Sequence, residues 1–364
     1  MDTPRPPRPE EMGELHRLGA LCFGFHPPTP RTSKRPPKVP AGARIIALDG
    51  RPVSTISMSY SRLSLEGANM KVVSFGGVCT HPDYRGRGIA SRLLRACMYE
   101  AAAKATLLII SGDQGLYRRA HAVPSGPVWR ATVRPGDVPT GPGAVTIRRV
   151  GAEDWSAVAR LYQAEPVRFV RTAQNYAGHL HHGHHRVWMV EHDSRPVAYF
   201  CLAHVWGRVP RTVCALGEYA GSRAALLDSL KLLFSTGSVT ELRVAFPQHD
   251  EEFTYLCRTR GLALRPGTIP DHTIRLLNLP DLMRGLRPYA LARLSPAEVR
   301  GLRFAQTELA CQFTFGDESQ EMDLSQAGRL VLGGPGAPKG KGKLGAVLGR
   351  ILPIPMPLPG LNYV

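Results

Sequence analysis

Apolar positions switch between helical and strand-like spacing along the chain. In residues 11–23 and 89–103, apolar side chains recur three and four positions apart, which predicts two amphipathic helices. Residues 43–60 and 70–80 have the composition of strands. Residues 106–111 are apolar almost throughout, as in a buried parallel strand. The first third of the chain therefore predicts an α/β domain.

A proline- and glycine-rich linker at residues 132–144 ends this unit, and strand- and helix-like segments then recur in the same order. This recurrence indicates a degenerate internal duplication. After residue 278 the pattern changes again and ends in an extended, proline-rich stretch. We predict an α/β class with mixed α+β sheets and three domains, at residues 1–135, 144–277 and 278–364.

Length and composition restrict the class of protein. The hydrophobic content of 43% excludes wholesale disorder. No apolar run approaches the ~20 residues that cross a bilayer, and the N-terminal stretch lacks the apolar segment of a secretory signal. The seven scattered cysteines are typical of reduced thiols, so we expect a cytoplasmic protein.

The net charge of +17 leaves two interpretations open: an anionic partner, or a soluble surface rich in arginine. The charge is spread along the chain and no recognition helix or zinc finger is present, so we expect neither nucleic acid nor membrane as partner. The histidine-rich run at residues 179–185 has metal-binding side chains, but no neighbouring carboxylate or thiolate completes a shell. We predict a solvated loop there and no metal. Whether the chain forms a homo-oligomer is left open.

The most specific signal is the glycine-rich turn between the strand at 70–80 and the helix at 89–103. Glycine allows positive φ and close approach of a ligand to the backbone. The first N–H groups of a helix attract phosphate, and Arg85, Arg87 and Arg92 add positive charge. The turn lacks the Gly-Lys-Ser/Thr of a P-loop and the spacing of a dinucleotide fingerprint. It therefore predicts a pyrophosphate cradle.

The hexapeptide from Arg85 to Ala90 resembles the Gln/Arg-x-x-Gly-x-Gly/Ala signature of the GNAT superfamily of N-acetyltransferases. The resemblance implies acetyl-CoA as the co-substrate. Backbone groups of the strand before the turn would pair with the pantetheine arm, and N–H groups of the turn would hold the pyrophosphate. The implied cofactor-binding residues are Val78, Cys79, Thr80, Arg85, Gly86, Arg87, Gly88, Ile89 and Ala90.

Residues 115–122 look like the superfamily's Leu-Tyr-x-x-x-Gly-Phe element, with His121 and Ala122 in place of Gly-Phe. The resemblance implies that Tyr117 is the general acid that protonates the departing thiolate. Many relatives take their base from a glutamate on the strand before the phosphate turn. Residues 71–80 contain no carboxylate, which indicates a base from elsewhere, an ordered water, or an acceptor that arrives already neutral.

The three-part order resembles the Eis-type (enhanced intracellular survival) acetyltransferases. These have a GNAT domain, a second GNAT-like domain and a small sterol-carrier-protein-like α+β C-terminal domain. In that family the C-terminal carboxylate acts as base, which implies Val364 here. The second unit has no phosphate signature at residues 216–223, where Glu218 would repel a pyrophosphate, so we expect no CoA there.

The acceptor is expected to be a primary amine, on a small molecule or a peptide. In the resembled GNAT fold the segment after the first helix shapes the acceptor pocket, which implies that Phe23, Phe25 and His26 form part of it. Core packing is an equally open interpretation for Phe23. Direct attack of the amine on the thioester needs no covalent intermediate, so Cys79 is not a predicted nucleophile. Two alternatives remain: a non-catalytic acyl-CoA sensor, and a nucleic-acid-associated protein, which the intact phosphate turn disfavours.

Overall fold

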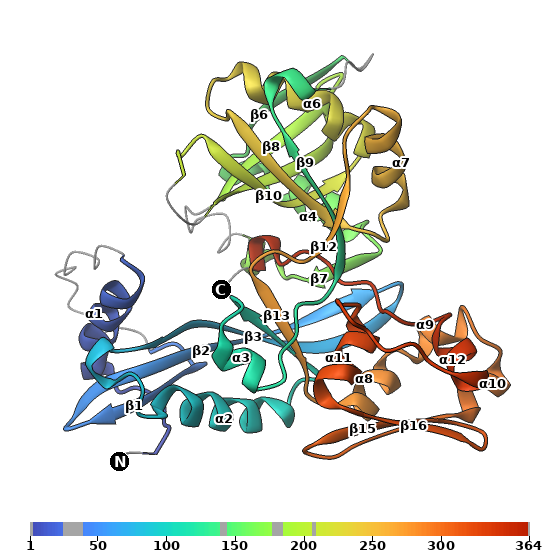
Figure 1. Cartoon of the computed structure of the whole chain (residues 1–364). Helices are drawn as coiled ribbons and strands as arrows, with labels where there is room; N and C mark the ends of the chain where they lie inside the picture. The colour runs from blue at the N-terminus through green and yellow to red at the C-terminus, as the bar shows by residue number, and fades with distance from the viewer. Residues whose placement is uncertain (1–2, 25–38, 139–143, 177–184, 206–208, 363–364) are drawn as a thin grey trace.

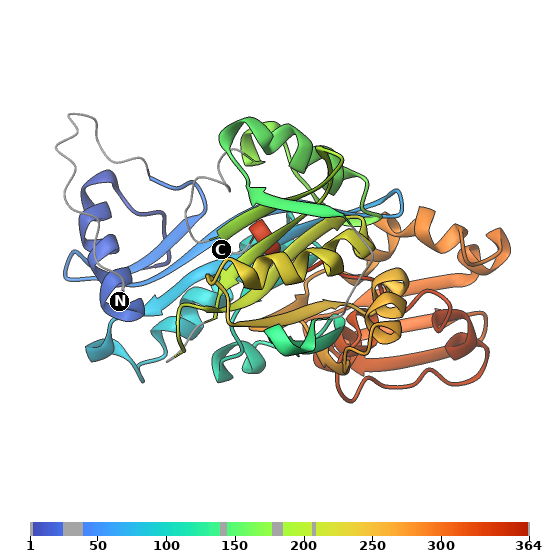
Figure 2. The same cartoon turned by 90° about the horizontal axis from the view of Figure 1, so that it is seen from above.

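The structure is a computed structural model that describes residues 3–24, 39–138, 144–176, 185–205 and 209–362. Figure 1 shows three sheets with helices against them, and the second sheet lies above the first. Seen from above in Figure 2, the N-terminal and C-terminal parts lie on opposite sides, and the second sheet with its helices covers the middle.

The first sheet is mixed, and its helix α2 packs against β1, β2 and β3. Its strands are, in spatial order, β1 (Ala43–Leu48), β2 (Arg51–Leu65), β3 (Ala68–Thr80), β4 (Leu107–Ser111) and β13 (His272–Leu276), with β7 (Val167–Val170) beside β2. Its helices are α1 (Met12–Phe23), α2 (Ile89–Ala102) and α3 (Gly115–Arg119). The buried strand expected at 106–111 is β4, which runs parallel to β3, and the predicted mixed-sheet class is confirmed.

The second sheet has seven strands. In spatial order they are β12 (Arg265–Thr268), β5 (Pro127–Val133), β11 (Glu241–Pro247), β10 (Val213–Gly221), β9 (Arg195–His204), β8 (His185–His192) and β6 (Val145–Arg149). Its helices include α4 (Trp155–Gln163), α6 (Arg223–Ser235) and α7 (Glu251–Thr259).

The two sheets repeat one pattern. In each sheet an antiparallel meander leads into a pair of parallel strands, which is β3–β4 in the first sheet and β10–β11 in the second. A helix begins after the first strand of each pair: α2 follows β3, and α6 follows β10. Each parallel pair is then extended by one antiparallel strand, β13 or β5. The expected duplication is therefore visible as two sheets of matching topology.

The last strand of each sheet comes from the other half of the chain. β5 follows the first repeat in sequence but pairs with β11 of the second sheet, whereas β13 follows the second repeat and pairs with β4 of the first. Both exchanges bury apolar side chains, among them Val133 and Ile274. The two repeats are thus interleaved, and the three-domain division at residues 135–144 and 277–278 stays a prediction.

The C-terminal part has a three-stranded antiparallel sheet covered by short helices. Its strands are β14 (Leu302–Gln306), β15 (Ala310–Phe315) and β16 (Glu318–Asp323). Its helices are α8 (Leu279–Gly285), α9 (Arg287–Leu291), α10 (Pro296–Gly301), α11 (Leu324–Leu332) and α12 (Gly342–Leu348). Over the ranges that the structure describes, no helix has the length and apolar character to cross a membrane.

Candidate active site

The two strands of the first parallel pair separate before β3 ends. β3 pairs with β4 only over Val72–Phe75, although β3 continues to Thr80. A β-bulge interrupts its pairing with β2 between Gly76 and Cys79, so that Gly77 and Val78 lie in the bulge. Along Gly76–Thr80, the edge of β3 that faces β4 pairs with no other strand among the residues that the structure describes. This edge offers backbone groups to an extended ligand such as a pantetheine arm.

The glycine-rich turn leads from this edge into α2. Gly86 and Gly88 have φ of 76° and 73°, and Gly88 is the residue that precedes the helix. No atom lies within 4 Å of where their β-carbons would stand, so glycine is required by conformation and not by space. The first N–H groups of α2, at Ile89 and Ala90, have no acceptor within the helix. The turn thus places free donors and the positive end of a helix at the end of the open strand edge.

Arg85 and Arg87, the two arginines of the turn, make different contacts. Arg85 folds back, and its Nε donates to the carbonyl oxygen of Thr80 at 3.1 Å. Arg87 lies over the ring of Tyr84, with 5.2 Å from the guanidinium carbon to the ring centroid. Arg85 therefore stabilises the strand end, while Arg87 is exposed and packs on Tyr84.

Helix α1 ends beside the same strand end. The thiol of Cys22 donates to the carbonyl oxygen of Thr80 at 3.5 Å, and the Ser54 hydroxyl lies 2.9 Å from that of Thr80. The neighbouring Phe23 is 42% exposed. Phe23 thus directly follows a residue that contacts the predicted cofactor strand, and its place in an acceptor pocket stays a prediction. The other two predicted pocket residues, Phe25 and His26, lie outside the described residues.

Cys79 is buried at the end of β3. Burial raises the pKa of this thiol far above its usual value, and the adjacent Cys22 adds to the effect. The thiol therefore stays protonated at neutral pH, which agrees with a direct-transfer mechanism rather than a cysteine nucleophile.

Tyr117 lies in α3, which follows β4, and is 5% exposed. It belongs to the apolar cluster that contains Phe75, and Val78 packs against that cluster. The turn is closed by an ion pair between Arg118 and Asp113. The structure thus brings the predicted acid and the predicted cofactor strand into one cluster.

His121 stands where the resembled element has glycine. Its φ is 60°, which is the left-handed conformation that glycine favours. Its Nδ1 lies 3.2 Å from the hydroxyl of Ser325 in α11. The departure in sequence therefore preserves the backbone shape of the turn and links it to the C-terminal part.

The C-terminal segment is buried along most of its described length. Ile354, Met356 and Leu361 are each 2% exposed or less. The segment ends in the turn η5 (Gly360–Asn362), which contacts β10. The predicted base, the carboxylate of Val364, lies outside the described residues.

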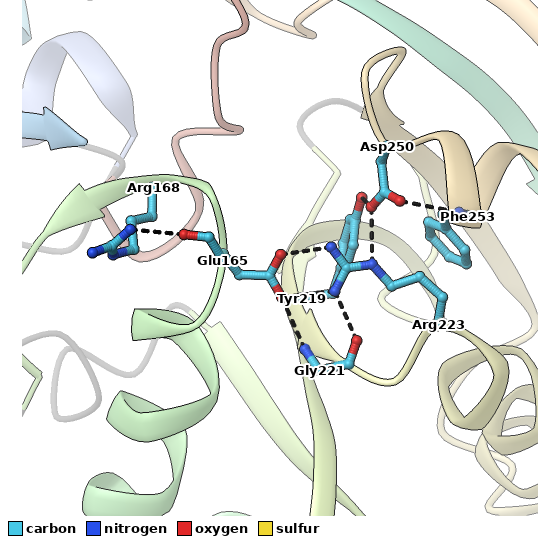
Figure 3. Close-up of polar contacts among 7 residues, drawn as sticks. All are labelled: Glu165, Arg168, Tyr219, Gly221, Arg223, Asp250 and Phe253. Carbon is cyan, nitrogen blue, oxygen red and sulfur yellow. Dashed lines mark hydrogen bonds and ion pairs between the residues drawn. The ribbon is translucent and has the colours of Figure 1, made fainter. Parts of the chain in front are cut away.

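At the corresponding turn of the second repeat, the protein's own carboxylates bind the polar groups and line a cavity of about 280 Å³ (Figure 3). At the end of β10, the N–H of Gly221 donates to Glu165 at 3.0 Å. Arg223, the first residue of α6, donates to Glu165 and to Asp250. Tyr219 donates to Asp250 at 2.7 Å. A carboxylate thus binds at the turn that corresponds to the predicted phosphate turn of the first repeat.

Sequence reasoning did not find the other polar cluster of this repeat. Arg171 and Glu218 form an ion pair with side chains only 1% and 3% exposed. They are 47 positions apart, and no local pattern connects them. Over the described ranges, no group of three histidine, cysteine or acidic side chains could hold a metal ion.

Residues 3–119 match the family model described as an acetyltransferase (GNAT) domain. These residues form a GNAT acetyltransferase domain. The match includes β3, the glycine turn and Tyr117, so the recognition from sequence and the predicted acyltransferase class are confirmed for this GNAT domain. No curated protein matches the chain in sequence.

Solved structures extend the likeness in fold to nearly the whole chain. A probable N-acyltransferase from Enterococcus faecalis has 15% identity and a TM-score of 0.63, covering 91% of this chain and 90% of its own. A GCN5-related N-acetyltransferase from Anabaena variabilis has 13% identity and a TM-score of 0.62, covering 90% and 89%. Eis1 from Mycobacterium abscessus has 14% identity and a TM-score of 0.57, covering 91% and 90%. At these identities the likeness concerns the fold, in which the GNAT domain is one of several parts.

Proposed function

We propose that this chain is an acetyl-CoA-dependent N-acetyltransferase that moves an acetyl group to a primary amine. The observation that carries the proposal is the open edge of β3 at Gly76–Thr80, which runs directly into the glycine turn and α2. The edge suits the amide-bearing pantetheine arm, and the helix start suits the pyrophosphate. The residues present therefore fit the co-substrate.

The reaction proposed is direct transfer. The amine nitrogen attacks the thioester carbonyl carbon, and a backbone N–H near Val78 stabilises the oxyanion. The carbon–sulfur bond then breaks, and the Tyr117 hydroxyl gives its proton to the departing thiolate. The amine's own proton passes to a base, which we propose is the carboxylate of Val364.

The chain's cysteines agree with a reducing compartment. All seven are free, and a buried reduced thiol is typical of cytoplasmic proteins. We therefore propose a cytoplasmic enzyme whose acceptor is a small-molecule or peptidyl amine, without nucleic acid or membrane as partner. The C-terminal part would be the sterol-carrier-protein-like domain of an Eis-like architecture.

The test is release of CoA thiol from acetyl-CoA with a panel of amines, from polyamines to lysine peptides. Turnover with any amine supports the transferase, and the productive amine gives the acceptor class. If acetyl-CoA binds tightly but no amine produces thiol, the chain is instead a non-catalytic acyl-CoA-binding protein. That second function is favoured only by the absence of a carboxylate from the 71–80 segment.

A further inference from the structure

A cavity of about 790 Å³ lies between the second sheet and the C-terminal part of the chain. Its walls come from β5 and β12 on one side, and from α11, the loop after α11 and the end of α12 on the other. Among the described residues that line it, none belongs to the Gly76–Thr80 edge, the glycine turn or α3. The cavity has the size of a small-molecule site and is separate from the GNAT site.

Three basic side chains line this cavity, and each comes from a different element. They are Arg130 of β5, Arg329 of α11 and Lys339 of the loop between α11 and α12. In the part of the chain that the structure describes, no aspartate or glutamate lines the cavity, and none of the three cations forms an ion pair. We call it the basic cavity, and its charge is available to a ligand.

Arg130 is held at the edge of the second sheet. One of its terminal nitrogens donates to the carbonyl oxygen of Thr268 in β12. A β-carbon at Gly267 would collide with the Arg130 side chain, so glycine at this position leaves room for the arginine beside β12. A guanidinium has five N–H donors, and the others of Arg130 have no acceptor among the described residues.

The loop that carries Lys339 is closely packed, although it is rich in glycine and proline. A β-carbon at Gly340 would lie only 2.4 Å from the α-carbon of Gly345, so glycine is required there for space. At the start of α12, Glu318 accepts a hydrogen bond from the N–H of Leu344 at 2.8 Å. These contacts fix the loop at both places, so this wall of the basic cavity is preformed.

Most of the remaining wall is apolar, with prolines and leucines that include Pro127, Leu330, Leu348 and Leu352. Apolar walls strengthen the attraction between cations and a bound anion, because they keep water away from it. Three separate cations suit a ligand that carries more than one negative charge, and the apolar wall suits a carbon body between those charges.

We propose that the basic cavity binds a small organic anion that carries two or more carboxylate or phosphate groups. Arg130 and Lys339, which are exposed, bind the acid groups from the sheet and from the loop, and the half-buried Arg329 binds them from α11. The bound molecule bridges the second sheet and the C-terminal part. This site goes beyond the proposed acetyl transfer and does not depend on it.

The test is isothermal titration calorimetry of the full chain at low ionic strength, where attraction between exposed charges is least screened. Citrate is the carboxylate probe, fructose bisphosphate is the phosphate probe, and acetate carries a single charge. The cavity variant replaces the three cations together, as Arg130→Gln, Arg329→Gln and Lys339→Gln. The control makes the same change of charge at exposed positions of β2 and β3, as Arg51→Gln, Arg62→Gln and Lys71→Gln.

We expect the wild type and the control to bind citrate or fructose bisphosphate with a Kd of about 1 mM or tighter. The cavity variant should bind that probe about 10- to 100-fold more weakly, because it loses charge-assisted hydrogen bonds. Lys339→Gln alone, at an exposed loop position, should weaken binding by about 3- to 10-fold without changing the contacts of β12. The probe that binds more tightly identifies the preferred acid group.

Two results would overturn the site. Neither probe may bind the wild type, or the cavity variant and the control may bind both probes alike; the three cations are then ordinary solvated groups of the surface. Acetate that binds as tightly as either probe would overturn the requirement for more than one charge. None of these results bears on acetyl transfer, which is measured separately by thiol release.

Discussion

Glu165 accepts a hydrogen bond from the backbone N–H of Gly221 at 3.0 Å, at the turn that opens α6. The corresponding turn of the first repeat opens α2, and its N–H groups are the ones proposed to bind the pyrophosphate. In the second repeat the carboxylate is also bound by Arg223, with both side chains 12% exposed (Figure 3). In the second repeat an internal carboxylate thus stands where the first repeat is proposed to bind an external anion.

This arrangement predicts one acetyl-CoA per chain. A second pyrophosphate would have to displace Glu165 from Arg223 and Gly221, and η5 from β10. Isothermal titration calorimetry should give a stoichiometry close to one. Glu165→Gln should leave that stoichiometry unchanged, because Asp250 still binds Arg223 and η5 still contacts β10. A stoichiometry near two would contradict the assignment of a single cofactor groove.

The conformation of Gly88 predicts a specific effect on cofactor binding. Its φ of 73° lies in the left-handed region, which costs a residue with a β-carbon about 1–2 kcal/mol. In Gly88→Ala, relaxation of that strain should turn the N–H groups of α2 away from the phosphate. The KM for acetyl-CoA should rise by about 5- to 30-fold, a factor that follows from that energy.

Gly50 gives a matched control for this change. It lies in the β1–β2 turn with φ of 75°, and its β-carbon position is equally open. Gly50→Ala should therefore lower the melting temperature by a similar amount and leave the KM for acetyl-CoA unaltered. Equal effects of the two variants on KM would show that Gly88 acts through stability alone.

The sequence predicts the cofactor turn because its signals are local. The apolar spacing of α2, the apolar run of β4 and the glycines between strand and helix all act over a few residues. The same is true of the turn that carries Tyr117. The structure adds that His121 preserves a glycine-like φ, which the residue type alone does not reveal.

The rest of the fold and of the second repeat's polar cluster depends on contacts between distant parts of the chain. β5 and β13 are short segments whose partners, β11 and β4, lie more than 100 positions away. Pairing of this kind is decided by tertiary packing, so residues 132–133, taken as linker from composition, instead end strand β5. The Arg171–Glu218 pair was missed for the same reason, because its partners carry no shared local pattern.

Tyr117→Phe removes only the hydroxyl that is proposed to protonate the thiolate. Because the ring remains in its buried place, kcat should fall by about 10²-fold or more while the Kd for acetyl-CoA stays within threefold. Pre-steady-state thiol release measures this loss. Tyr99, which is 86% exposed on α2, provides the control, and Tyr99→Phe should be silent. An unchanged kcat in Tyr117→Phe would remove Tyr117 from the mechanism.

Stability should fall in two stages as the pH is lowered. Burial lowers the pKa of His272 below its usual 6.5, so the unfolded chain binds this proton more readily than the folded one. The stabilisation is complete above pH 6.5 and is lost as the pH falls toward the folded value. Hydrogen bonds from Arg5 lower the pKa of Glu11, so the stabilisation by Glu11 is present above about pH 4.5 and is lost below it.

The melting temperature should thus begin to decline below pH 6.5 and fall more steeply below pH 4.5. His272→Gln should reduce the decline below pH 6.5, to which the lowered pKa of His249 also contributes, and Glu11→Gln should reduce the decline below pH 4.5. A melting temperature that stays constant from pH 7 to 5 would contradict the role of His272.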